Sequence, residues 1–179
     1  MGNYIFNAQS LIDAIERDGE NPDSSHDMGG DIIPYFVNQG TAGAYDFTFN
    51  EIPGATARDK SYWRDEGTID SYYDAHMDLI STMPIFNLNN SDWPVNNQQI
   101  NLPPAKFIHD SEGNQGRTQD SIVSLGVVVS GGVVDRSVLS HNVRVSSRTL
   151  ITESVLLDDV QVGRDCTIRK AILDKNVVV

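Results

Sequence analysis

The stretch KSYWRDEGTIDSYYDAH, residues 60–76, combines residue types that can do chemistry directly before a predicted helix. It contains an aromatic pair, Arg64 and the two carboxylates Asp65 and Glu66. Carboxylates in a loop of this kind can hold a divalent cation. They can equally form an exposed ion pair with the arginine, which would contribute little to stability. Residue types alone therefore leave an active-site interpretation and a surface-loop interpretation open.

Two further stretches in the first half have the same ambiguity. In SSHDMGGDIIP, Asp27 and Asp31 precede a predicted helix, where an aspartate usually serves as a helix cap. In MGNYIF, Tyr4 belongs to an apolar run that predicts a short buried strand over residues 3–6. Trp63 also has a structural alternative, as an aromatic residue of the core.

Helices and short strands over residues 1–82 must position these side chains. Asn7 is predicted to cap a helix that ends at Gly19. Residues 29–40 predict a second helix, with Pro34 in its first turn, where proline is tolerated. These elements indicate a mixed α/β unit.

The rest of the first half changes its pattern twice. Residues 44–52, AYDFTFNEI, alternate apolar and polar side chains and predict a half-buried strand. Thr68 is predicted to cap a helix with apolar residues at helical spacing. Residues 83–120 are rich in Asn, Pro, Gln, Gly and Ser, which predicts a long linker.

From residue 121 the sequence repeats with a period of about 17 residues. The repeats cover 121–136, 137–153, 154–170 and 171–179. Aliphatic residues recur 17 apart in three series, namely Val138/Val155/Ile172, Val145/Val162/Val179 and Ile151/Ile168. Three short strands per repeat predict a triangular prism of stacked coils, a left-handed parallel β-helix. The first two series are predicted to point into the prism, and the alternative is a β-sandwich.

The charge of the chain limits its partners. The 179 residues include 25 Asp and Glu against 13 Lys and Arg, a formal net charge of -12. This excess repels phosphate backbones and anionic lipid, so neither nucleic acid nor a membrane is an expected partner. The sequence has no apolar run of the length that a membrane helix needs, and its one cysteine fits a reducing cytoplasm.

Taken together, these motifs resemble the glucose-1-phosphate adenylyltransferase (ADP-glucose pyrophosphorylase) family. The matching stretches are MGNYIF, SSHDMGGDIIP, YWRDEGTIDSYYDAHMDL, LPPAKF and RKAILDKNVVV. The resemblance implies the C-terminal part of a Rossmann-like α/β nucleotidyltransferase catalytic domain over 1–82, a linker over 83–120 and a truncated hexapeptide-repeat β-helix over 121–179. It also implies a fragment that is inactive alone, with Met1 an internal methionine.

The resemblance implies an enzyme of glycogen biosynthesis that makes ADP-glucose and pyrophosphate from ATP and glucose 1-phosphate. By this resemblance Asp65 is catalytic and binds Mg²⁺. Tyr4, Asp27, Met28 and Trp63 would contact glucose 1-phosphate, and Met28 stands where the family usually has phenylalanine.

Regulation and assembly are also expected from the resemblance. Lys175 stands where well-studied members have a basic residue, usually arginine, that contacts a phosphorylated metabolite effector. The resemblance further implies a cytoplasmic homotetramer. Three alternatives stay open: a non-catalytic regulatory subunit of the same family, another sugar-1-phosphate nucleotidyltransferase, and a hexapeptide acyltransferase with His141 as the coil histidine.

Overall fold

The structure is a computed structural model that describes residues 2–97 and 100–179. The chain forms two compact units, Met1–Phe47 and Thr48–Val179, which are described separately below. Within the described residues, the longest apolar helices fall short of what a membrane crossing requires.

The first unit consists of helices. They are α1 (Ala8–Gly19), η1 (Met28–Ile32) and α2 (Ile33–Asn38). Asn7 caps α1 because its side chain accepts a hydrogen bond from the backbone N–H of Ser10. Pro34 lies in the first turn of α2, where its missing N–H breaks no helical hydrogen bond. The predicted cap, the end of α1 at Gly19 and the position of the proline are all confirmed.

Two strands predicted for the first half are absent from the described residues. Residues 3–6 are extended but pair with no other strand there, and Ile5 is fully exposed. Residues 44–52 contain only a short 3₁₀ helix, η2 (Phe47–Phe49), and Tyr45 and Phe49 are mostly exposed. A strand is stable only when it pairs with a neighbouring strand, and among the described residues neither segment is part of a sheet.

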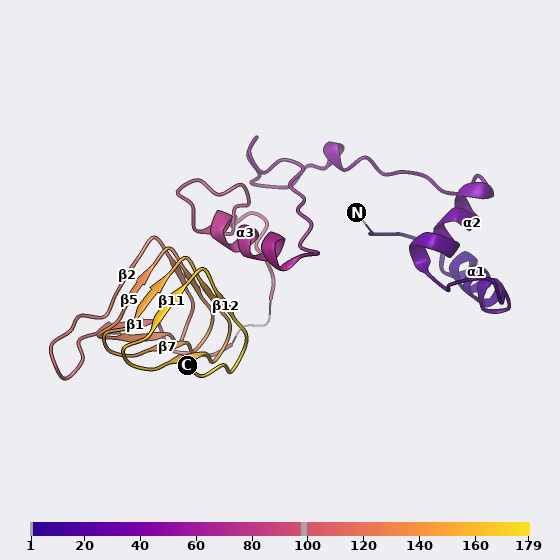
Figure 1. Cartoon of the computed structure of the whole chain (residues 1–179). Coiled ribbons are helices and arrows are strands. Elements are labelled where there is room, and N and C mark those ends of the chain that lie inside the picture. The colour runs from indigo at the N-terminus through magenta and orange to yellow at the C-terminus, as the bar shows by residue number, and fades with distance from the viewer. Residues whose placement is uncertain (1, 98–99) are drawn as a thin grey trace. The chain divides into compact units, whose positions relative to one another are not determined.

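The second unit contains one α-helix and a solenoid of stacked coils (Figure 1). Helix α3 spans Ile69–Leu79, and the Thr68 hydroxyl caps it by accepting a hydrogen bond of 3.1 Å from the backbone N–H of Ser71. The predicted cap is therefore confirmed. The cap also fixes where the loop carrying Asp65 ends and the helix begins.

Three parallel four-stranded sheets form the sides of the solenoid. The first sheet contains β1 (Lys106–Ile108), β4 (Val128–Ser130), β7 (Arg144–Val145) and β10 (Gln161–Val162). The second contains β2 (Arg117–Gln119), β5 (Val133–Asp135), β8 (Leu150–Thr152) and β11 (Thr167–Arg169). The third contains β3 (Ile122–Val123), β6 (Val138–Leu139), β9 (Val155–Leu156) and β12 (Ile172–Leu173).

The register of these sheets is the one that the repeats predict. Val138 pairs with Val155, and Val155 pairs with Ile172. The same offset pairs Val145 with Val162 in the first sheet. The predicted stack of parallel coils is confirmed, and it is consistent with a left-handed β-helix.

In the third sheet, the residues that point into the prism are not the predicted ones. Leu139 and Leu156 are wholly buried in the hydrophobic core, and Leu173 packs against it. Successive side chains of a strand point to opposite faces, so Val138 and Val155 face outward. The prediction that they point inward was wrong. The prediction for Val145 and Val162 is confirmed, because both belong to the core.

The outward valine of β9 is nevertheless buried. Val155 is 0% exposed, which means that another element covers the outer face of the third sheet. The hydroxyl of Tyr73, in α3, donates a hydrogen bond of 2.7 Å to the backbone carbonyl of Glu153. Because Glu153 is two residues before Val155, this contact places α3 on that side of the solenoid.

The solenoid begins earlier than the predicted boundary at 121. Residues 106–108 and 117–119 were assigned to the linker, but they form β1 and β2 and pair with β4 and β5. Between these two strands the chain makes a hairpin closed by the antiparallel bridge of His109 and Gln115. We call residues 109–115 the corner hairpin.

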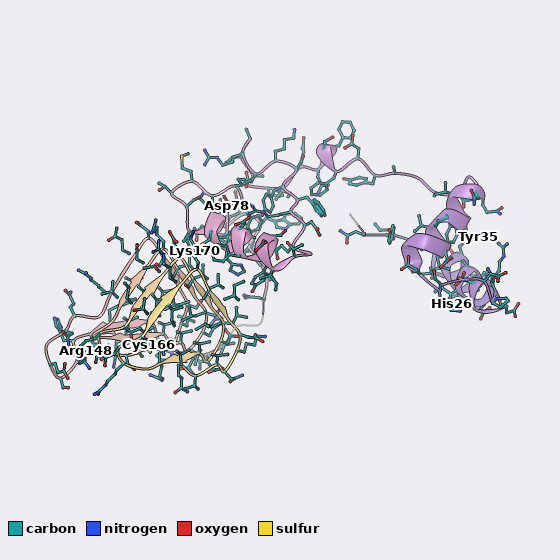
Figure 2. All side chains as sticks on the ribbon, in the orientation of Figure 1. His26, Tyr35, Asp78, Arg148, Cys166 and Lys170 are labelled. Atoms are coloured by element: carbon teal, nitrogen blue, oxygen red, sulfur yellow. The ribbon has the colours of Figure 1, made fainter. Side chains whose placement is uncertain are left out.

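Polar residues hold the corner hairpin in place. Asp110 accepts hydrogen bonds from the backbone N–H groups of Glu112 and Asn114 and from the Asn114 side chain. Arg148 contacts Glu112 in the hairpin and makes two hydrogen bonds of 2.7 and 2.8 Å to Asp165 in the next coil. Figure 2 shows Arg148 at the outer edge of the solenoid, where it joins the hairpin to two coils.

Serine residues link successive coils inside one corner. The backbone N–H of Ser137 donates to the hydroxyl of Ser121, and the N–H of Ser154 donates to the hydroxyl of Ser137. The N–H of Ala171 donates in turn to the hydroxyl of Ser154. We call Ser121, Ser137 and Ser154 the serine ladder. The ladder satisfies backbone N–H groups at the corners, where the chain leaves one sheet before it enters the next.

Candidate functional site

Asp27 lies at the start of η1 and caps it. Its Oδ1 accepts a hydrogen bond of 2.6 Å from the backbone N–H of Gly30. Asp31 returns the contact, because its Oδ2 accepts a hydrogen bond of 2.9 Å from the backbone N–H of Asp27. That backbone hydrogen bond, with a second from the Ser25 hydroxyl, lowers the pKa of the Asp31 carboxyl. The capping role that the sequence offered for Asp27 is therefore present.

Tyr4 lies close to Asp27 in the same unit. A Cβ atom built on Gly29 would be 3.4 Å from Oδ1 of Asp27 and 4.0 Å from the hydroxyl oxygen of Tyr4. Both polar groups therefore flank the same glycine backbone. Tyr4 is 45% exposed, and its ring lies 6.2 Å from that of Phe6, so the hydroxyl stays accessible to a ligand.

Met28 borders a separate hollow of the first unit. This hollow has a volume of about 320 Å³ and is lined by Ile15, Asp18, Gly19, His26, Met28 and Ile32. Nδ1 of His26 lies 2.9 Å from Oδ2 of Asp18 and closes one side of it. The first unit thus places the hydroxyl of Tyr4 and the carboxylate of Asp27 beside one glycine, while Met28 lines the separate hollow.

Trp63 and Asp65 lie in the second unit, in the loop before α3. Trp63 is 51% exposed, which rules out its alternative role as a core aromatic within the described residues. Asp65 is exposed, and its carboxylate has no hydrogen bond or ion pair among the described residues. A Cβ atom on Gly67 would be 3.1 Å from its Oδ2, so the glycine keeps space beside the carboxylate.

The sequence indicates Arg64 only as an ion-pair partner of a neighbouring carboxylate and not as a site residue. Its Nη1 is inaccessible to solvent and has no hydrogen-bond partner within the described part of the chain. The expected surface ion pair between Arg64 and Asp65 is absent there as well. The loop therefore offers a free exposed carboxylate, while the arginine beside it is partly buried.

Lys175 follows β12 and is exposed. Its backbone N–H donates to the Asp174 carboxylate, but its ammonium group has no ion pair among the described residues. The structure thus divides the predicted site residues into two sets. One set comprises Tyr4, Asp27 and Met28 in the first unit, and the other comprises Trp63, Asp65 and Lys175 in the second.

The carboxylate oxygens of Asp65 suit a divalent cation, but one carboxylate could supply only part of its ligands. In residues 2–97 and 100–179, no cluster of three or more His, Cys, Asp or Glu side chains could form a complete metal site. Mg²⁺ is often bound through one or two carboxylates, with water and substrate phosphates completing the coordination. A free, exposed carboxylate can take that part.

Comparisons with known proteins divide the chain at a different place from the two compact units. Residues 1–82 match the family model for a nucleotidyl transferase, and residues 103–179 match that for a GlmU-like C-terminal hexapeptide domain. The fold and the site thus define a nucleotidyltransferase segment joined to a hexapeptide-type solenoid.

Individual relatives narrow this class. The chain is 58% identical over its whole length to the glucose-1-phosphate adenylyltransferase of Arthrobacter sp. (strain FB24) and covers 38% of that protein. It is 60% identical to the enzyme of Pseudarthrobacter chlorophenolicus, with 38% covered, and 56% identical to that of Parafrankia sp., with 44% covered. The chain is therefore similar over its whole length to part of these glucose-1-phosphate adenylyltransferases, and it spans about two fifths of their length.

Proposed function

We propose that this chain contributes to an enzyme of glycogen biosynthesis that makes ADP-glucose and pyrophosphate from ATP and glucose 1-phosphate. The observation that carries the proposal is the identity of 58% over all 179 residues to an adenylyltransferase, which includes both the nucleotidyltransferase segment and the solenoid. A solenoid shared with other hexapeptide proteins could not support this alone, because one fold serves many activities.

In this proposal the first unit contributes contacts to glucose 1-phosphate. The hydroxyl of Tyr4 and the carboxylate of Asp27 flank one backbone position and would hydrogen-bond to sugar hydroxyls. Oδ1 of Asp27 already accepts from Gly30, which holds the carboxylate in place for its other oxygen to bind a ligand. Met28 would cover an apolar part of the sugar ring. Trp63, which belongs to the second unit, is a separate proposal for a contact to glucose 1-phosphate.

Asp65 would bind Mg²⁺, which stabilises negative charge on the phosphates when it is bound. The sugar phosphate attacks the α-phosphorus of ATP in line with the departing pyrophosphate, so the protein mainly positions groups and balances charge. The residues of this chain would orient the sugar phosphate and hold one carboxylate near the transferred group. The further proposals are a phosphorylated effector at Lys175, a homotetramer and a cytoplasmic location.

The test replaces the matching segment of the Arthrobacter sp. relative by this chain, which gives a complete enzyme that we call the joined protein. Asp65→Asn should lower its turnover on the order of 10²-fold or more, because a metal carboxylate supplies several kcal/mol and each ~1.4 kcal/mol is tenfold. Glu66→Gln is the matched control, since it removes the adjacent exposed carboxylate, and it should change turnover less than about threefold.

Pyrophosphate release and the melting temperature should be measured together. The asparagine keeps the shape of the side chain, so the melting temperature should hardly change. Trp63→Ala should act mainly through a higher KM for glucose 1-phosphate, with the KM for ATP less affected. Normal turnover of a folded Asp65→Asn protein would falsify the role of Asp65.

A further inference from the structure

Helix α3 contacts the solenoid through the hydroxyl of Tyr73. This hydroxyl donates to the carbonyl of Glu153, with 2.7 Å between the two oxygens. Burial raises the pKa of Tyr73, and the nearby charges of Glu153 and Asp74 raise it further, while Arg136 opposes them. The hydroxyl is therefore a neutral donor at physiological pH, held among charged groups of the helix and of the corner beside it.

The neighbouring residue Tyr72 is affected by charges from the loop before α3 and from the solenoid. Burial raises the pKa of Tyr72, and the charges of Glu66 and Asp174 both add to this effect. Glu66 follows Asp65 directly, and Asp174 follows β12. The pKa of this one side chain of α3 is therefore affected by a charge of the Asp65 loop and by a charge of the solenoid.

The carbonyl that accepts from Tyr73 is rigidly held. Glu153 has a positive φ of 48°, and Arg136 and Lys170 repeat this conformation at the same corner of the adjacent coils. The backbone N–H of Glu153 donates to the carbonyl of Asp135, and its side chain pairs with Arg136 at 3.0 Å. The acceptor for Tyr73 is therefore part of a corner that two coils hold in position.

The path from this corner to Asp65 is short. Tyr73 lies in the second turn of α3, whose start is fixed by the Thr68 cap three residues after Asp65. A capped helix moves as one body over such a length, so a shift of α3 on the solenoid would move the loop with it. Val155, two residues after Glu153, is fully buried although it faces out of the prism.

We propose that Tyr73 is a positioning residue, whose hydrogen bond to Glu153 makes the solenoid set the position of the Asp65 loop. The proposal rests on the proposed function only for the role of Asp65. In this arrangement the solenoid acts on the reaction from outside the substrate site, through a helix that the nucleotidyltransferase family model includes.

The first experiment measures amide hydrogen exchange on the 179-residue chain. Tyr73→Phe keeps the ring and removes the donor, and it should accelerate exchange of the hydrogen-bonded α3 amides about five- to tenfold. The solenoid strands should keep their exchange rates. Tyr72→Phe is the matched control, because the hydroxyl of Tyr72 has no hydrogen bond among the described residues, and it should change exchange less than twofold.

The second experiment is a double-mutant cycle of Tyr73→Phe and Asp65→Asn in the joined protein. If Tyr73 acts through Asp65, Tyr73→Phe should lower kcat about tenfold with KM values within twofold, and it should have no further effect once Asp65 is replaced. Equal exchange in wild type and Tyr73→Phe would overturn the proposal. So would an effect on kcat that is the same with and without Asp65.

The two experiments separate this proposal from the proposed function. If Asp65→Asn leaves turnover normal, the function assigned to Asp65 fails, whatever the exchange data show. If Asp65→Asn lowers turnover but Tyr73→Phe accelerates exchange without changing kcat, the function stands and the positioning role is refuted.

Discussion

The contribution of the serine ladder to the free energy of unfolding can be estimated from its individual hydrogen bonds. Ser154 is 0% exposed, and its hydroxyl makes two contacts. It donates to the carbonyl of Thr152 at 2.7 Å and accepts from the backbone N–H of Ala171 at 3.2 Å. Ser154→Ala removes both contacts with little change in volume, so the effect should come from hydrogen bonding.

The two contacts differ in what their loss leaves behind. The carbonyl of Thr152 keeps a second hydrogen bond from the N–H of Lys170, so its loss costs about 1 kcal/mol. The N–H of Ala171 has no other partner in the described residues, and an unsatisfied buried donor costs about 1–3 kcal/mol. The costs of losing the two contacts do not simply add. We therefore expect Ser154→Ala to lower the free energy of unfolding by about 2 kcal/mol. For a chain of this size that corresponds to about 4–8 °C in melting temperature.

Urea unfolding followed by circular dichroism, together with thermal melting, would measure this loss. Ser140→Ala is the matched control, because Ser140 follows β6 and its hydroxyl has no hydrogen bond in the described part of the chain. It should change the unfolding free energy by no more than about 0.5 kcal/mol. If the two alanine variants unfold at the same urea concentration, the ladder does not stabilise the solenoid and the reasoning is wrong.

Two further predictions concern charge. The side chain of Asn114 donates to Asp110 and, with the Ser147 hydroxyl and two backbone donors, holds the pKa of this carboxyl far below its ordinary value of 3.8. The resulting stabilisation is complete above about pH 4 and is lost as the pH falls further. Acid unfolding of wild type should therefore be steeper than that of Asp110→Asn, and identical acid titrations would contradict the assignment. In the joined protein, Lys175→Ala should weaken activation by a phosphorylated effector and leave the unactivated rate nearly unchanged, with Lys106→Ala as the control; equal activation curves for Lys175→Ala and wild type would return Lys175 to the solvated surface.

The stacking of the coils could be predicted from the sequence because the period of the aliphatic residues directly encodes which strands pair. Val138 and Val155 are in register because they are 17 residues apart, whichever way they point. Their direction could not be predicted, because the next residue in each strand, Leu139 or Leu156, is apolar too. Residues that face into the prism and residues that face out of it are both buried in this sheet, so polar and apolar residues do not alternate.

The caps of the helices were predictable, whereas the strands of the first half were not. Asn7 and Thr68 cap helices through contacts within three residues, which the local sequence specifies. A strand depends on a partner that is distant in sequence, and the alternation over 44–52 says nothing about whether such a partner is present. The early strands β1 and β2 were missed because the corner hairpin between them interrupts the period.

In the candidate site, too, contacts between residues close in sequence could be predicted, whereas contacts between distant residues could not. Residue types left Tyr4 and Asp27 with structural alternatives, and only the family resemblance implied a site that includes them and Met28. The structure adds that Tyr4 and Asp27 flank one glycine. The reciprocal contact of Asp31 could have been found from the spacing of the two aspartates on either side of a helix start. Nothing in the local sequence distinguishes Tyr73 from Tyr72, because the acceptor at Glu153 is 80 residues away.

The corner hairpin has a consequence for how such a solenoid can change its length. Coils repeat at 16 or 17 residues, and any insertion within a strand would shift every later contact by the same amount. The hairpin adds residues 109–115 at a corner, yet β1 still pairs with β4 and β2 still pairs with β5. Corners are therefore the positions at which evolution or an engineer can introduce new sequence without disturbing the stack. A peptide epitope or a binding loop grafted between His109 and Gln115 would be displayed on the surface while the coils keep their pairing.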